Sequence, residues 1–270
     1  MTHVKLLYGR GELSVDLPET SDVTLIRKPK MPKLEDPTLA VESTLSSPTA
    51  SALLKNHAKN ARTACILICD ITRPVPNSLI LGPIIRRLMT LGVPLKHITV
   101  LIATGLHRPN EGTELEELIG DPWVLENVNV ENHFARDDSA HIEVGTTKKG
   151  NRILLDSRFV SADVKIVTGL VEPHFMAGYS GGRKVIAPGV AHAETITTFH
   201  SARYMEDPLA ANCNLEGNPL HEDQLEIVEM VGGALAMNVV IDEFRNVSFI
   251  NFGEIISSHL EAVAFIRKYA

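Results

Sequence analysis

Seven side chains of this sequence have chemistry suited to an active site, because each can titrate, carry a charge or form a hydrogen bond. They are Asp70, Thr72, Arg73, His107, His174, Lys184 and His200. Histidine titrates near neutral pH, so His107 and His174 suit a proton donor and acceptor pair. Arg73 can hold a carboxylate through a bidentate fork, and Asp70 can orient a histidine or a sugar hydroxyl.

Lys184 and His200 suggest two further kinds of chemistry. Lys184 can be a nucleophile towards a carbonyl or thioacid, or a counter-charge for a phosphate. The imidazole of His200 is a common ligand for nickel, zinc and copper. Two histidines opposed around one carbon form the arrangement that a racemase needs, because each face must be both deprotonated and reprotonated. The spacing of the residues leaves these alternatives open and identifies no cofactor.

Lys184 ends the glycine-rich stretch AGYSGGRK at residues 177–184. Glycine lets a backbone approach a ligand closely, so the stretch resembles a phosphate cradle. It does not fit the common nucleoside-triphosphate loop, because Arg183 precedes the lysine and Val185 follows it. We expect residues 175–184 to be mobile without a ligand and a covering domain, because loops of this composition have few buried apolar contacts.

Three short apolar runs must position these groups. Residues 64–69, 98–102 and 164–168 are continuously apolar enough to be strands buried on both faces. Helical segments alternate with them, which predicts an α/β fold with a mainly parallel, Rossmann-like sheet flanked by helices. Ligands bind outside the carboxyl ends of such strands. Asp70 with Arg73, His107 with Arg108, and Glu172 with His174 would then meet at one sheet edge.

The remaining segments predict the periphery. Residues 4–17 form a hairpin with Gly9-Arg10-Gly11 near its turn, residues 142–155 form a second hairpin, and residues 28–50 form an extended connection. Helices are expected at residues 49–60, 78–91, 113–119, 219–231 and 254–269, and in a segment carrying His192 and His200. Two more strands are expected at residues 237–241 and 247–252.

The composition is that of an ordinary globular protein, with 44% hydrophobic and 22% charged residues among 270. We expect one α/β domain over residues 1–270, with no membrane span, because no apolar run reaches the necessary length. A net charge of −7 argues against a nucleic-acid partner but allows a small anionic substrate. The sparse cysteines Cys65, Cys69 and Cys213 lack metal-site spacing, so we expect a reducing, cytoplasmic location.

Four blocks of this sequence resemble the nickel-dependent lactate racemase family. They are DITRPVP at residues 70–76, ATGLHRP at 103–109, and EPH and GYSGGRK within 172–184, followed by His200. The resemblance covers nearly the whole chain and corresponds to the N-terminal domain of the family. It implies a racemase or epimerase of 2-hydroxy acids such as lactate.

The resemblance also implies a cofactor and roles for individual residues. The cofactor is the nickel-pincer nucleotide, a nickel complex of pyridinium-3,5-bisthiocarboxylic acid mononucleotide, joined to Lys184 through a thioamide. His200 is the implied protein ligand to nickel, and His107 and His174 are the implied acid/bases. Residues assigned to cofactor and substrate anchoring are Asp70, Thr72 and Arg73. A 2-hydroxy acid then loses its hydroxyl proton to a histidine and its hydride to the cofactor, and the flat 2-keto acid regains the hydride on either face.

Full-length members of that family carry a second domain, which we expect this chain to lack and to meet as a separate or truncated partner. Two other hypotheses remain. The chain is a non-catalytic module that binds a cofactor or carboxylate, or it is a zinc hydrolase with His107, His174 and His200 around one metal.

Overall fold

The centre of the fold is a six-stranded sheet with the strand order β12-β11-β8-β3-β4-β5. The computed structural model describes residues 2–9 and 11–269. Neighbouring strands are parallel except β12, which is antiparallel to β11. The predicted α/β fold with a mainly parallel sheet is therefore confirmed. The strands are β3 (Ala64–Cys69), β4 (Ile98–Ala103), β5 (Asn129–Asn132), β8 (Val164–Leu170), β11 (Leu235–Ile241) and β12 (Val247–Glu254).

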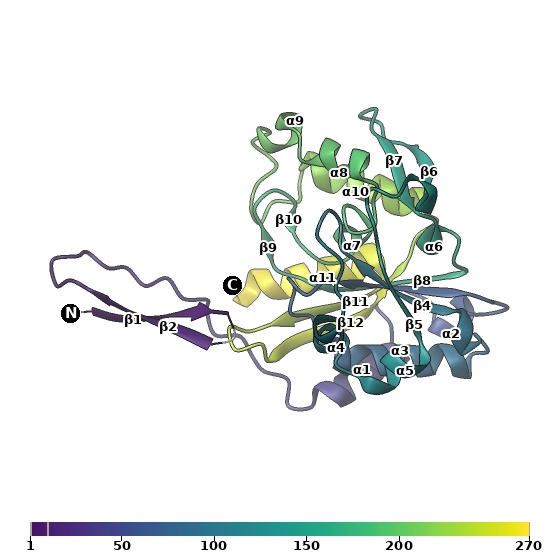
Figure 1. The fold of residues 1–270 in the computed structure, drawn as a ribbon, viewed down its shortest axis with the longest axis horizontal. Coiled ribbons are helices and arrows are strands. Elements are labelled where there is room, and N and C mark those ends of the chain that lie inside the picture. The colour runs from purple at the N-terminus through teal and green to yellow at the C-terminus, as the bar shows by residue number, and fades with distance from the viewer. Residues whose placement is uncertain (1, 10, 270) are drawn as a thin grey trace.

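Helices cover both faces of this sheet, which is why its central strands are apolar on both sides (Figure 1). Ile66 and Ile68 of β3 pack against one helical layer, and Leu67 packs against the other. The first layer contains α1 (Pro37–Ser46), α2 (Leu54–His57), α3 (Asn77–Thr90), α4 (Thr113–Ile119) and α5 (Pro122–Asn127). The second contains α6 (Ser157–Val160), α7 (Arg183–Ile186), α8 (Ala193–Phe199), α9 (Ala202–Met205), α10 (Pro219–Met230) and α11 (Ile255–Tyr269).

The direction of the chain reverses at the middle of the sheet. From β3 the chain moves outward through β4 to β5, and it then returns to place β8 on the other side of β3. The strands β8, β3 and β4 are adjacent and parallel, so their carboxyl ends lie at one edge. Such a topological switch point is where ligands bind in open α/β sheets.

The segment before β3 differs from the prediction. Residues 28–50 include a helix, α1, because Asp36 accepts a hydrogen bond from the Leu39 amide at 2.9 Å and Pro37 occupies the first helical turn. The helix expected over residues 49–60 shrinks to the single turn α2. Thr49 is not helical because its backbone N–H and C=O bond to β12, at 2.8 and 3.0 Å.

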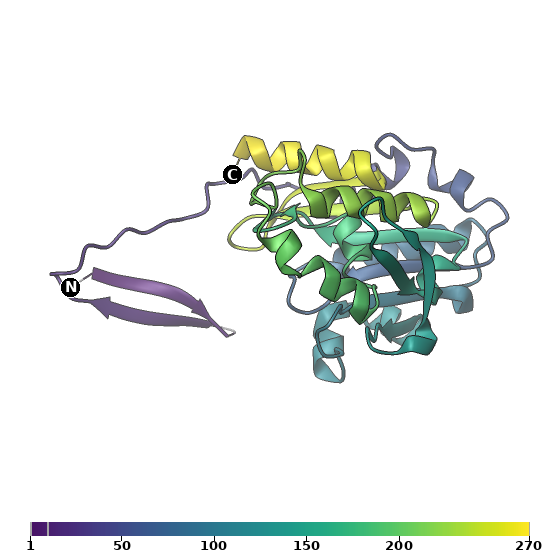
Figure 2. The same ribbon diagram turned by 90° about the horizontal axis from the view of Figure 1, so that it is seen from above.

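Two predicted hairpins are present, together with a strand that the sequence did not suggest. The second hairpin pairs β6 (His141–Thr146) with β7 (Arg152–Asp156), and the short edge strand β5 was missed. The first pairs β1 (Thr2–Tyr8) with β2 (Gly11–Leu17), and its turn residue Arg10 lies outside the described residues. Figure 2 shows this first hairpin standing away from the body on an extended segment. Across the described residues, no helix has the length and apolarity needed to cross a membrane.

We expect Gly253→Ala to destabilise the fold. A Cβ on Gly253 would lie 2.1 Å from the backbone oxygen of Thr49, so β12 could not keep its bridge to the preceding segment. Overpacking of this kind costs about 1–3 kcal/mol. Urea unfolding measures the change, with Gly11→Ala as the matched control because a Cβ on Gly11 would meet no atom within 4 Å. Equal stabilities of the two variants would contradict this account of β12.

Candidate functional site

A cavity of about 380 Å³ lies at the carboxyl ends of β3, β4 and β8, and all seven residues singled out in the sequence line it. These are Asp70, Thr72, Arg73, His107, His174, Lys184 and His200. They come from the three loops after the central strands, from α7 and from the end of α8. The sheet topology therefore brings together side chains that are far apart in the sequence, such as Asp70 and His200, which are 130 positions apart.

His107 and Asp70 form a pair at the mouth of this cavity. His107 Nδ1 lies 2.6 Å from Asp70 Oδ2, with the histidine side chain 60% exposed and the aspartate 6% exposed. The other oxygen of Asp70 accepts a hydrogen bond from the Thr72 hydroxyl at 2.6 Å. Because a carboxylate only accepts, the proton of the neutral imidazole sits on Nδ1. Nε2 of His107 is therefore free to accept a proton from a substrate.

His174 has the opposite hydrogen-bond arrangement. Its Nδ1 accepts the backbone amides of Met176 and Ala177, at 3.3 and 3.1 Å, so the ring proton sits on Nε2. Burial, followed by the nearby cations Lys184 and Arg73, lowers the pKa of His174 to about 3. In this structure His174 is a neutral ring whose proton is on Nε2.

The cavity also contains cations without acidic partners. Burial, and then the charge of Arg73, lowers the pKa of Lys184 to about 8. Arg73 donates to the Thr72 carbonyl at 3.3 Å. Within the described residues, neither cation forms an ion pair with a carboxylate. An unpaired buried or half-buried charge is costly, so this arrangement favours an anionic ligand.

His200 lies directly after α8 and caps its carboxyl end, while His192 caps its amino end. His200 Nδ1 donates to the Ile196 carbonyl at 2.8 Å, which leaves Nε2 with a free lone pair. A backbone carbonyl that fixes one ring nitrogen in this way is typical of metal-binding histidines.

Among the described residues, no three His, Cys, Asp or Glu side chains converge as a metal-binding group. The three-histidine arrangement that the zinc-hydrolase hypothesis needs is therefore not observed.

The glycine-rich loop is packed, and the premise of our expectation that it is mobile is wrong. Met176, Ala177 and Tyr179 are at most 2% exposed, so the loop does have buried apolar contacts. Residues Pro173–His174 (β9) and Gly178–Tyr179 (β10) form a small antiparallel pair. The Ser180 hydroxyl donates to the Leu170 carbonyl at 2.7 Å, which ties the loop back to β8.

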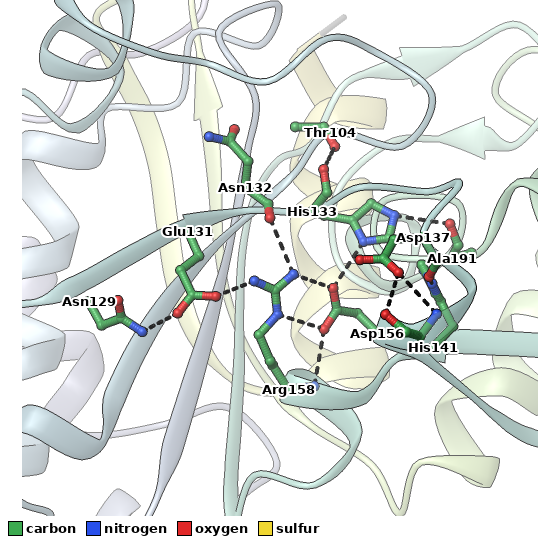
Figure 3. Close-up of polar contacts among 11 residues, drawn as sticks. Thr104, Asn129, Glu131, Asn132, His133, Asp137, His141, Asp156, Arg158 and Ala191 are labelled. Atoms are coloured by element: carbon green, nitrogen blue, oxygen red, sulfur yellow. Dashed lines mark hydrogen bonds and ion pairs between the residues drawn. The ribbon is translucent and has the colours of Figure 1, made fainter.

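A buried polar network supports the loop that carries His107 (Figure 3). The Thr104 hydroxyl donates to the His133 carbonyl at 2.7 Å, and His133 Nδ1 lies 3.1 Å from Asp156. Arg158 forks onto Asp156 at 2.9 and 2.6 Å and also pairs with Glu131. Burial raises the pKa of Asp156, but hydrogen bonds from Arg158 and His133 outweigh it and hold that pKa well below its usual range. The charged groups Asp156, Arg158 and Glu131 of this network form ion pairs with one another, whereas the cations of the cavity have no carboxylate partner among the described residues.

Several residues are not where the sequence suggested. Arg108 turns away and pairs with Glu114 in the first turn of α4, and neither Arg108 nor Glu172 lines the cavity. Several further lining residues were not predicted from the sequence to have a role in the site, and some of them lie within the quoted sequence blocks. Among them are Cys69, Thr104, Leu106, Phe175 and Ser180. Their position directly beside the strand ends is the signal that could have found them.

Comparisons with known proteins match this chain to one family. The family model described as the lactate racemase N-terminal domain matches residues 8–212. The lactate racemase of Lactiplantibacillus plantarum is 32% identical over 228 residues, which cover 84% of this chain and 53% of that protein. The lactate racemase of Thermoanaerobacterium thermosaccharolyticum is 30% identical over 274 residues, which cover 100% of this chain and 63% of that protein. The chain thus spans between half and two thirds of the length of these relatives.

Solved structures agree with the sequence relatives. The lactate racemase apoprotein of Thermoanaerobacterium thermosaccharolyticum superposes with a TM-score of 0.87 at 29% identity, over 100% of this chain and 63% of that chain. A Thermotoga maritima protein solved by a structural genomics consortium has a TM-score of 0.69 at 22% identity, over 86% of this chain and 58% of that chain. The second comparison shows a shared fold alone.

We expect the backbone of the glycine-rich loop to be protected from hydrogen exchange in the ligand-free protein. The Ser180 amide donates to the Glu172 carbonyl at 2.9 Å, and the Lys184 amide donates to the Gly181 carbonyl at 3.0 Å. Both bonds lie among buried residues, so local opening has to expose apolar surface. Exchange measured by mass spectrometry should be slow for residues 178–184 and fast for residues 18–30. Equally fast exchange in the two segments would restore the view that the loop is mobile.

Proposed function

Because this chain belongs to the lactate racemase N-terminal domain family, we propose that it carries the cofactor-binding and acid/base half of a 2-hydroxy-acid racemase. One observation carries this proposal: His107 and His174 line the same cavity with opposite hydrogen-bond arrangements. Nε2 of the first has a lone pair that can accept a proton, and Nε2 of the second carries the ring proton and can donate a hydrogen bond. A racemase has to handle protons on a substrate of either configuration, and this pair supplies both functions.

The residues of the cavity fit a nickel-pincer nucleotide. The phosphate and thiocarboxylate groups of such a nucleotide are anionic, and Lys184 and Arg73 are cations without carboxylate partners. We propose that Lys184 holds the nucleotide covalently and that Arg73 and Thr72 anchor it or the substrate carboxylate. Nε2 of His200 has a free lone pair for the metal. When bound, this group supplies a reversible acceptor for the C2 hydride of the substrate.

The protein residues then perform the proton chemistry. Asp70 holds the His107 ring so that Nε2 can take the hydroxyl proton of the substrate. To give up the Nε2 proton and remain a neutral ring, His174 must first take a second proton on Nδ1 in place of the amide hydrogen bonds there, and its pKa of about 3 opposes this in the ligand-free protein. Burial is the main cause, and the charges of Lys184 and Arg73 add to it. Neutralising these two charges with an anionic ligand raises the pKa of His174 and so prepares it for proton transfer.

We also propose that a further domain covers the cavity, on the same or on a separate polypeptide. Leu106 and Phe175 line the cavity and remain 47% and 65% exposed. Exposed apolar side chains at the rim of a polar site suit a covering surface. The extra length of the lactate racemase relatives supports such a domain.

A binding module without catalysis is the second candidate. The unpaired cations of the cavity favour it, because they explain affinity for an anion without needing either histidine. Racemisation assayed on a panel of 2-hydroxy acids, after the protein is produced in cells that make the cofactor, separates the two candidates.

The first functional test concerns cofactor attachment. Protein produced in such cells should contain nickel near one equivalent and should show an added covalent mass. Lys184→Ala should fold normally and lose the added mass, because the attachment point is gone. Lys165→Ala is the matched control, since that lysine lies in β8 outside the cavity and should leave the mass unchanged. The same adduct on wild type and Lys184→Ala, seen by intact-mass spectrometry, would sink the assignment.

A second test concerns the histidine pair. Replacing either His107 or His174 with Ala should slow racemisation of both enantiomers by about 10² to 10⁴-fold, because each direction uses both residues. His192→Ala is the control and should leave the rate of racemisation nearly unchanged. Its side chain caps α8 and pairs with Asp138 outside the cavity. A kinetically silent substitution at position 107 or 174 would show that the histidine there is structural.

A further inference from the structure

Arg183 is a buried cation beside the proposed attachment residue. It is 1% exposed, and it ranks among the largest fully buried side chains of the described chain. Its guanidinium donates to the Ala177 carbonyl at 3.1 Å and approaches the Tyr179 carbonyl at 3.5 Å. Its Nε has no hydrogen-bond partner, and no carboxylate pairs with it within the described residues. Burial lowers the pKa of Arg183 to about 9, which leaves it cationic at neutral pH.

His259 of α11 completes the surroundings of Arg183. One guanidinium nitrogen lies 3.0 Å from His259 Nε2, and the same ring nitrogen lies 2.9 Å from the Ser180 carbonyl. Burial, and then the charge of Arg183, lowers the pKa of His259 well below its usual value, so the ring is neutral. A Cβ on Gly182 would lie 3.1 Å from this ring, so the loop, Arg183 and α11 are in close contact.

Holding a loop in place with an unpaired buried charge costs free energy. Replacing buried charged groups with apolar residues of similar volume is often neutral or stabilising. Carbonyl groups alone compensate a guanidinium less well than a carboxylate does. The absence of a carboxylate partner within the described part of the chain means that the charge of Arg183 is not cancelled at its source. Its field therefore reaches the neighbouring loop and Lys184.

We propose that Arg183 is a positioning residue for Lys184, holding the loop against α11 and keeping the lysine amine free to react. The inference rests on the proposed covalent role of Lys184 and deepens it. Arg183 does not line the cavity, so it acts through its neighbour and does not touch the ligand.

The charges around Lys184 agree with this role. Burial lowers the pKa of Lys184 most, Arg73 adds to the effect, and Arg183 lowers it further, while Cys69 and Glu172 act in the opposite direction. Arg183 and Lys184 also both contribute to the low pKa of His174. A lysine with a pKa of about 8 is partly a free amine at neutral pH, whereas an ordinary lysine is almost fully protonated. A nucleophilic or acylated lysine needs the free amine.

The test measures the reactivity of Lys184 in cofactor-free protein. Limited acetylation with an N-hydroxysuccinimide ester between about pH 6 and pH 10, followed by peptide mass spectrometry, gives a pH–rate profile for each lysine. Removing a nearby positive charge raises the pKa of an amine, so Arg183→Met should move the midpoint for Lys184 upward. The expected shift is a few tenths of a pH unit, because burial and Arg73 contribute more than Arg183 does, and it lowers the acetylation rate of Lys184 at pH 7 by about twofold.

Two controls separate charge from shape. Arg183→Lys restores a cation only while the buried ammonium stays protonated, so it is compared at the low end of this pH range, where the acetylation rate of Lys184 should stay near that of the wild type. Lys165 serves as the internal reference: burial lowers its pKa, and Arg183 is not among the charges that act on it. Its profile should be the same in all variants. If Arg183→Met does not fold, Arg183→Gln keeps a donor for the Ala177 carbonyl and carries the same test.

The outcomes distinguish this inference from the proposed function. An unchanged midpoint in Arg183→Met overturns the inference, because the charge then has no effect on Lys184. An equal loss of Lys184 acetylation in Arg183→Met and Arg183→Lys at the low end of the pH range overturns it as well. An upward shift in Arg183→Met with rescue in Arg183→Lys supports it. If that shift occurs but the protein never gains a covalent cofactor, the inference about Lys184 stands and the proposed function fails.

Discussion

The parallel register of β8, β3 and β4 is the constraint on which the site depends. Ile66 of β3 lies opposite Val100 of β4 and Ile166 of β8, so the three strands run side by side without offset. Their loops therefore start from one edge, and side chains such as Asp70 and His107 come within hydrogen-bond distance. A register shift of one residue would move the side chains on each face of a strand to the other face of the sheet. Apolar contacts on both sides of the sheet make such a change very costly.

Charge is distributed unevenly between the support and the cavity. Behind the site, Asp156 and Arg158 compensate each other and Arg158 also meets Glu131, so that region is stable without any ligand. In front, Arg73 and Lys184 have no such partners among the described residues. This division lets a rigid network fix the position of the loops while the cavity keeps a positive potential for binding. The repulsion between these unpaired positive charges is relieved only when an anion binds in the cavity.

The sequence predicted the elements whose signals are local and missed those that depend on tertiary contacts. Residues 64–69 and 113–119 carry clear patterns, an apolar run and an acidic first turn, and both elements are present. The helix α1 was not predicted, although Asp36 and Pro37 are a normal helix start signal. The many polar residues of that segment favoured the prediction of an extended connection. The buried position of Arg183 could not be predicted, because it depends on His259, which is 76 positions away. The candidate site was found because all its strands carry local signals; the roles of its residues stay proposals.

The attachment of the N-terminal segment to β11 and β12 has a consequence for the order of folding during synthesis. The Phe252 amide bonds to the Thr44 hydroxyl across 208 positions of sequence, and Lys28 bonds to the Ile241 carbonyl across 213 positions. The ribosome therefore releases residues 28–50 long before the strands that hold them exist. Loop closure over such a separation is slow, and a nascent chain with an unpaired edge is exposed to aggregation meanwhile. Residues 28–50 therefore become packed only after β11 and β12 have been synthesised.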